Sequence, residues 1–77
     1  MKIYLLTRPE NMPPDWDEWN GAVVAAESED RARMIHPGEN EKTWPGWIPP
    51  AKVIVRKIGV AEPDIAAGVI LEDFHAG

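Results

Sequence analysis

Side chains that could carry out covalent chemistry are scarce in this chain. It has no cysteine, and Ser28 is its only serine. Ser28 precedes Glu29 and Asp30, where it is better explained as a helix N-cap than as an activated nucleophile. Neither His36 nor His75 stands at a spacing that implies a catalytic partner. We therefore predict that the protein is not an enzyme and has no catalytic residues.

Metal and phosphate sites are also poorly supported. The stretch D-W-D-E-W-N-G at 15–21 is similar to the start of a calcium loop, but Trp19 stands at its fifth position and Ala26 at its twelfth, where Glu is needed. A site made by His36, His75 and a carboxylate is conceivable, yet no clustered ligand pattern is present. The six glycines are scattered singly, so there is no phosphate loop. We expect neither a metal nor a cofactor.

The four tryptophans are the residues that favour binding. They form two W-x-x-W pairs in segments rich in proline and acidic residues. Each indole can bury about 150–250 Å², so a small domain can hardly leave all four in water. We expect at least two to cover the sheet and the others to form an aromatic anchor for a partner protein. The candidate anchors are Trp16, Trp19, Trp44 and Trp47, with Asp15, Asp17 and Glu18 as a charged rim.

Charge and hydropathy exclude two classes of partner. Thirteen Asp and Glu against eight Lys and Arg give a net charge of −5, which argues against binding a nucleic-acid backbone. No apolar run approaches the roughly 20 residues that span a bilayer. The first apolar run ends at Arg8 and Pro9, too early for a signal peptide. We expect a cytoplasmic protein that binds neither nucleic acid nor membrane.

At 77 residues the chain is expected to form one small α+β domain. Apolar and branched residues predict strands over about 2–8, 21–27, 51–58 and 68–74, and Ser28 predicts a short helix over about 29–35. Proline-rich segments predict long loops at 9–20 and 37–50. The first strand is apolar on both faces, which is typical of a central strand. The order β-β-α-β-β favours a mainly antiparallel sheet of three to four strands, with the helix on one face.

Three stretches resemble small uncharacterised proteins of tailed bacteriophages and prophages. They are M-K-I-Y-L-L-T-R at 1–8, V-V-A-A-E-S at 23–28 followed by Ala32-Arg33, and G-V-I-L-E-D-F-H-A-G at 68–77. The resemblance implies a phage-encoded accessory protein in the bacterial cytoplasm and brings no site residues with it. Proteins of this kind often bind and block a host protein, defence factors included.

Two functional hypotheses follow from the residues and the resemblance. The first is a non-enzymatic interaction module that binds a host protein through the 9–20 and 39–50 loops. The alternative is a homodimeric accessory protein in which an exposed strand edge pairs two copies and the tryptophans lie at the self-interface.

Overall fold

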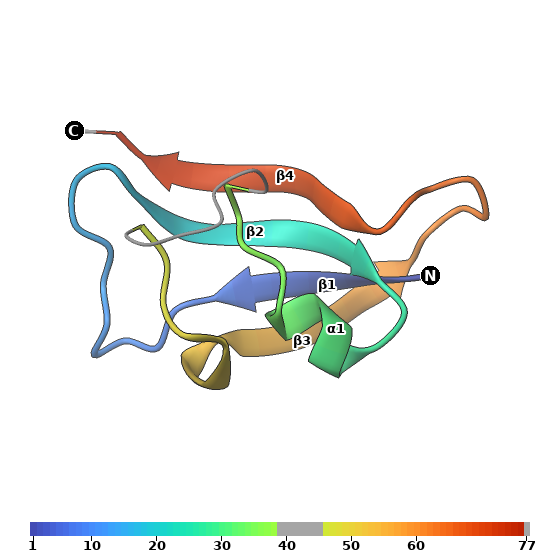
Figure 1. Cartoon of the computed structure of the whole chain (residues 1–77), viewed down its shortest axis with the longest axis horizontal. Coiled ribbons are helices and arrows are strands. Elements are labelled where there is room, and N and C mark those ends of the chain that lie inside the picture. Colours follow the sequence, from blue (N-terminus) through green and yellow to red (C-terminus); the bar gives the residue numbers. More distant parts are fainter. Residues whose placement is uncertain (39–45, 77) are drawn as a thin grey trace.

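The computed structural model describes residues 1–38 and 46–76 of the chain. Four strands form one antiparallel sheet in the order β3-β1-β2-β4. Their bounds are Lys2–Thr7 for β1, Glu18–Ala26 for β2, Ile54–Val60 for β3 and Gly68–His75 for β4. A short helix, α1 (Glu29–Arg33), lies in front of β1 and β3 in Figure 1. The predicted α+β class is confirmed.

Strand β1 ends where proline removes its next amide donor, at Pro9. It pairs with β2 on one side and β3 on the other, so it is central, as predicted from its two apolar faces. Tyr4 and Leu6 point to the side of the sheet that carries α1 and are buried there. Ile3 and Leu5 face the other side, since successive side chains of a strand alternate.

Strand β2 begins at Glu18, three residues before the predicted start at Gly21. The prediction treated Asn20-Gly21 as the end of a loop, but the strand passes through both residues. Its register with β4 shifts between Trp19 and Gly21, so Asn20 is accommodated as a bulge rather than as a turn. Trp19 therefore lies on a strand, and the loop before β2 is shorter than the predicted 9–20.

Helix α1 is capped as the sequence indicates, because the Ser28 Oγ accepts a hydrogen bond from the Arg31 N–H at 3.2 Å. It ends at Arg33, two residues before the predicted end, with Met34 as its C-cap. Ala32 is fully buried against the sheet. A helix this short is stable only through such packing.

Strand β3 begins at Ile54, later than the predicted start near residue 51. Pro50–Lys52 instead form a 3-10 turn, which the fixed backbone of proline favours. The Arg33 guanidinium donates to the carbonyls of Pro50 and Val53, both at 3.0 Å, and so ties this turn to α1. Part of the predicted 37–50 loop, residues 39–45, lies outside the described residues.

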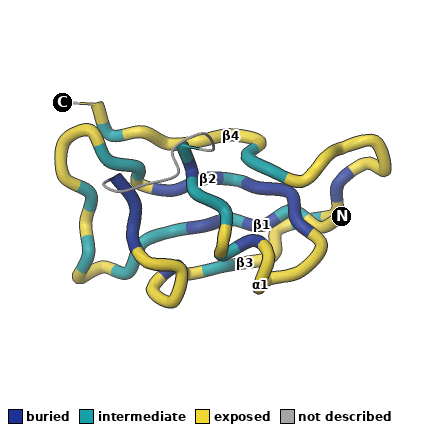
Figure 2. Tube along the Cα trace, in the orientation of Figure 1, coloured by how far each residue is buried: buried dark blue, intermediate teal, exposed yellow. Residues whose placement is uncertain are grey.

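The main hydrophobic cluster of the described residues lies on the side of the sheet that carries α1. Its buried members are Tyr4, Leu6, Ala22, Val24, Ala26, Ala32, Trp47, Ile48 and Val53. Figure 2 shows burial concentrated in β1 and β2, while most of β3 and β4 is exposed. The described residues place no helix on the opposite side of the sheet. No helix in this part of the chain is long and apolar enough to cross a membrane.

Candidate functional site

The described tryptophans lie at one end of the sheet, where the 8–17 turn, residues 46–48 and the end of β4 meet (left in Figure 1). They differ sharply in exposure. Trp47 is 7% exposed, Trp19 is partly buried, and Trp16 is 64% exposed. Trp44 falls among the residues that the structure does not describe. The two W-x-x-W pairs therefore do not form a single aromatic surface.

Trp47 is part of the core, beside Ile48 and Val53. The Arg8 guanidinium lies 5.5 Å from the centre of its ring, a cation–π contact. Among the described residues, its buried Nε1 has no hydrogen-bond acceptor. A ring this deeply buried offers no surface to a partner, so the structure gives Trp47 a structural place instead of the predicted anchoring one.

Trp19 is held by contacts with several other parts of its own chain. Its Nε1–H donates to Glu72 Oε2 at 2.8 Å, and its ring contacts Phe74 and His36 with centroids 4.8 and 5.2 Å apart. Gly46, at a φ of +124°, lies so close that a Cβ there would sit 2.6 Å from Trp19 Cζ3. Trp19 thus joins β2, β4 and the segment at Gly46, which accounts for its partial burial.

Among the described tryptophans, Trp16 is the one whose side chain is largely exposed to solvent. Its ring lies against the His75 ring, with centroids 4.7 Å apart and planes tilted by 47°. Its backbone N–H donates to Asp15 Oδ1 at 2.8 Å. The next residue, Asp17, has a φ of 60° and donates its N–H to the His75 carbonyl at 2.7 Å. We call Asp15, Trp16, Asp17 and His75 the acidic aromatic turn.

The three predicted rim residues do not share one role. Asp15 and Asp17 are exposed beside Trp16. Glu18 is partly buried, and its Oε1 accepts from the Asp15 N–H at 2.9 Å and from the Arg8 guanidinium at 3.4 Å. Glu18 therefore holds the turn, while Asp15 and Asp17 lie on its exposed side beside Trp16.

Arg8 organises this end of the molecule, and sequence reasoning missed it. Its side chain is 7% exposed. It donates to the carbonyls of Trp19, Met12 and Gly46 at 2.7, 3.1 and 3.3 Å, besides its ion pair with Glu18. Most of its acceptors are backbone carbonyls, which leave no mark in a sequence. The one signal is the alternation of the strand, which would place Arg8 on the same side of the sheet as the buried Tyr4 and Leu6.

In the described ranges, no group of three His, Cys, Asp or Glu side chains is close enough to hold a metal ion. The exposed groups of the acidic aromatic turn include the Trp16 indole and the side chains of Asp15 and Asp17. Scanned against protein-family models, curated proteins and solved structures, the chain matches none.

Proposed function

We propose that the protein is a non-enzymatic interaction module that binds a basic surface of another protein through the acidic aromatic turn. The exposure of Trp16 carries the proposal. Trp47 is buried in the core and Trp19 is partly buried against it, while Trp16 is 64% exposed on a turn with several fixed contacts. An exposed indole in a fixed position is the kind of side chain that dominates protein interfaces.

The turn is held in place before any partner binds. Met12 donates its N–H to the Pro9 carbonyl at 3.0 Å, and its own carbonyl accepts from Arg8 at 3.1 Å. Asp17 is tied to β4 through the His75 carbonyl. Binding through such a turn orders little additional chain, which lowers the entropic cost of association.

The charge around Trp16 favours a basic partner. Asp15 and Asp17 flank the indole, and the whole chain carries a net charge of −5. Opposite charges on the two surfaces would speed the encounter and disfavour acidic partners. Lys or Arg side chains can also stack on the exposed face of the Trp16 ring. We expect the complex to weaken as the salt concentration rises.

The proposed partner is a host protein of a bacterium infected by a phage that encodes this chain. This part of the proposal rests on the resemblance of the three sequence stretches to phage and prophage proteins. A cytoplasmic location belongs to the same proposal.

The test compares proteins captured from a bacterial lysate by the wild type, by Trp16→Ser and by Met34→Ser. Met34 is a matched control because it is an apolar residue, 68% exposed, at the C-cap of α1. We expect Trp16→Ser to lose a basic protein that the wild type and Met34→Ser retain, and added salt to release it. Capture of the same proteins by all three would overturn the proposal.

A further inference from the structure

The side of the sheet that faces away from α1 presents two cross-strand rows of side chains. One row runs Arg56, Leu5, Val23 and Leu71 across β3, β1, β2 and β4, and the next runs Ile54, Thr7, Gly21 and Asp73. We call these eight residues the open face. Its apolar side chains come from all four strands, and its two charges lie on the two edge strands.

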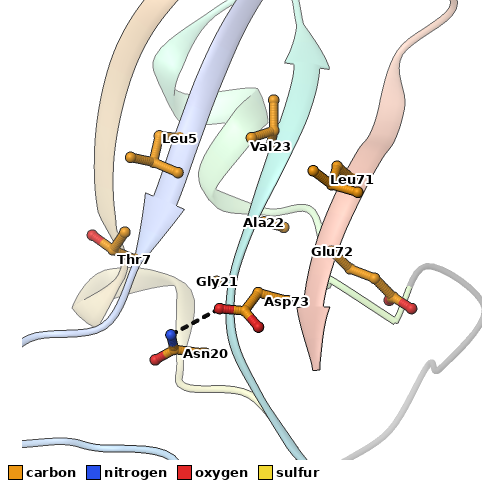
Figure 3. A pocket seen from close by; sticks show the side chains of 9 residues that line it. All are labelled: Leu5, Thr7, Asn20, Gly21, Ala22, Val23, Leu71, Glu72 and Asp73. Carbon is orange, nitrogen blue, oxygen red and sulfur yellow. Dashed lines mark hydrogen bonds between the residues drawn. The ribbon is translucent and has the colours of Figure 1, made fainter. Parts of the chain in front are cut away.

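The open face is apolar and accessible. Leu71 is 67% exposed and Ile54 is 50% exposed. A hollow of about 150 Å³ lies over Gly21, with Leu5, Val23 and Leu71 around it. Figure 3 shows these three side chains on the same side of the sheet. A hollow of this size has room for one aliphatic side chain.

We propose that a second copy of this chain covers the open face, with the two sheets packed face to face around a twofold axis parallel to their strands. This interface is separate from the acidic aromatic turn, so it stands or falls independently of the proposed partner protein. Face-to-face packing of two sheets with strands nearly aligned is a standard arrangement. The same apolar surface then serves both partners, as a twofold interface requires.

The positions of the two charges select this axis. A twofold axis parallel to the strands lays β3 of one copy over β4 of the other, because it reverses the strand order. Arg56 then lies over Leu71 of the copy, and along the strand direction it is offset from Asp73 of the copy by two residues, about 7 Å. The arginine and aspartate side chains together can cover this offset and the separation of about 10 Å between packed sheets. A twofold axis across the strands would instead lay β3 over β3 and bring the two Arg56 side chains together.

Arg56 is available for this contact, since no described residue forms an ion pair with it. Among the described residues, the Asp73 carboxylate accepts one side-chain hydrogen bond, from Asn20 Nδ2 at 2.9 Å, and a carboxylate can accept several more. The dimer would contain this charge pair twice, once at each edge. The charges thus complement each other between copies although they lie far apart within one copy.

The charges on the edge strands β3 and β4 disfavour a dimer in which either edge pairs with the same edge of the copy. Full antiparallel pairing of β3 with its own copy centres on Lys57 and places two lysines opposite each other. Antiparallel pairing of β4 with itself about its centre places Glu72 beside Glu72 of the copy. Charges on edge strands commonly prevent this kind of association. The two copies are therefore expected to meet by their faces and not by their edges.

The area of the face predicts a weak dimer. Four strands about 4.8 Å apart and about six residues long cover roughly 400 Å² on each copy. Projecting side chains raise the total accessible area buried by both copies to about 1,000 Å², the lower end of specific interfaces. We expect a dissociation constant in the micromolar range, so the monomer should dominate on dilution.

The first test is sedimentation velocity across a hundredfold concentration range that spans the micromolar region. We expect the mass to rise from 8.6 kDa toward twice that value, about 17.2 kDa, and to stop there. Leu71→Glu should abolish the rise, while Met34→Glu, at a residue of nearly equal exposure at the C-cap of α1, should leave it unchanged. A strict monomer, an open series of larger species, or equal effects of the two variants would overturn the proposal.

A charge exchange tests the twofold axis. Arg56→Asp and Asp73→Arg should each weaken association at least tenfold, because each places like charges together. The double variant should recover most of the wild-type affinity, since the pair is restored with its signs exchanged. If the losses of affinity simply add in the double variant, the proposed arrangement is contradicted. Circular dichroism of all three variants is the control, and should show that the sheet is intact.

Discussion

At the residue scale, Trp47 and Trp16 should respond very differently to truncation. Trp47→Ala removes a large side chain from the core and should lower the free energy of unfolding by about 3–5 kcal/mol. Trp16→Ala removes a ring that touches mainly His75, and should cost less than about 1 kcal/mol. Urea denaturation followed by circular dichroism measures both. Similar losses for the two variants would show that Trp16 is a structural residue.

Arg8 should not tolerate replacement by lysine. A single ammonium cannot reproduce the fork that reaches three carbonyls and Glu18, so buried acceptors would be left unpaired. We expect Arg8→Lys to lower the free energy of unfolding by about 2–4 kcal/mol. Arg33→Lys is the control, because the Arg33 side chain is 27% exposed and should lose under about 1 kcal/mol. Equal losses of unfolding free energy in Arg8→Lys and Arg33→Lys would show that Arg8 stabilises the fold no more than Arg33 does.

The sequence indicated the importance of the tryptophans but not which of them would be exposed. Size alone predicts that several indoles must be buried, and Trp19 and Trp47 are packed against the core as expected. Trp16 is the exposed one because Arg8 and Glu18 fix the turn that carries it, through the Met12 carbonyl and the Asp15 N–H. Contacts between a side chain and distant backbone carbonyls have no sequence signature, so this part of the site was not predictable.

At the scale of elements, Gly21 in β2 and Gly59 in β3 form a matched pair, because both pair with the central strand β1, Gly21 opposite Thr7 and Gly59 opposite Ile3. A Cβ at Gly21 would lie 2.6 Å from the Leu6 carbonyl oxygen, so β1 and β2 would have to separate. We expect Gly21→Ala to cost about 1–3 kcal/mol. A Cβ at Gly59 would meet only Ile3 Cδ1 at 3.9 Å, and Gly59→Ala should change stability by no more than about 1 kcal/mol. Thermal unfolding that ranks the variants in the opposite order would contradict this account.

Element boundaries were predictable where one residue fixes the backbone. Pro9 ends β1 and Ser28 caps α1, and both features appear in the structure. The start of β2 was wrong because Asn20-Gly21 is typical of a turn, whereas pairing with β4 turns Asn20 into a bulge. The start of β3 was wrong because Pro50–Lys52 form a 3-10 turn before the ladder begins. The first error arises from long-range pairing that local residue types do not encode, whereas the second arises from a local turn that proline favours.

At the scale of the whole molecule, a sheet with a core on one side leaves its other side to water or to a partner. If a second copy covers the open face, folding and association are linked, and the midpoint of thermal unfolding should rise with protein concentration. Leu71→Glu should make the midpoint independent of concentration, while Met34→Glu should preserve the dependence. A wild-type midpoint that stays constant over a hundredfold range would contradict the dimer.

The exposure of Trp16 on a fixed turn is the claim on which the proposed function rests, and tryptophan fluorescence tests it most directly. The emission that disappears in Trp16→Phe should have its maximum close to that of tryptophan in water and be quenched freely by acrylamide. The emission that disappears in Trp47→Phe should be shifted to the blue and protected. If Trp16→Phe instead removes blue-shifted, protected emission, the turn buries its indole and the proposed binding site does not exist.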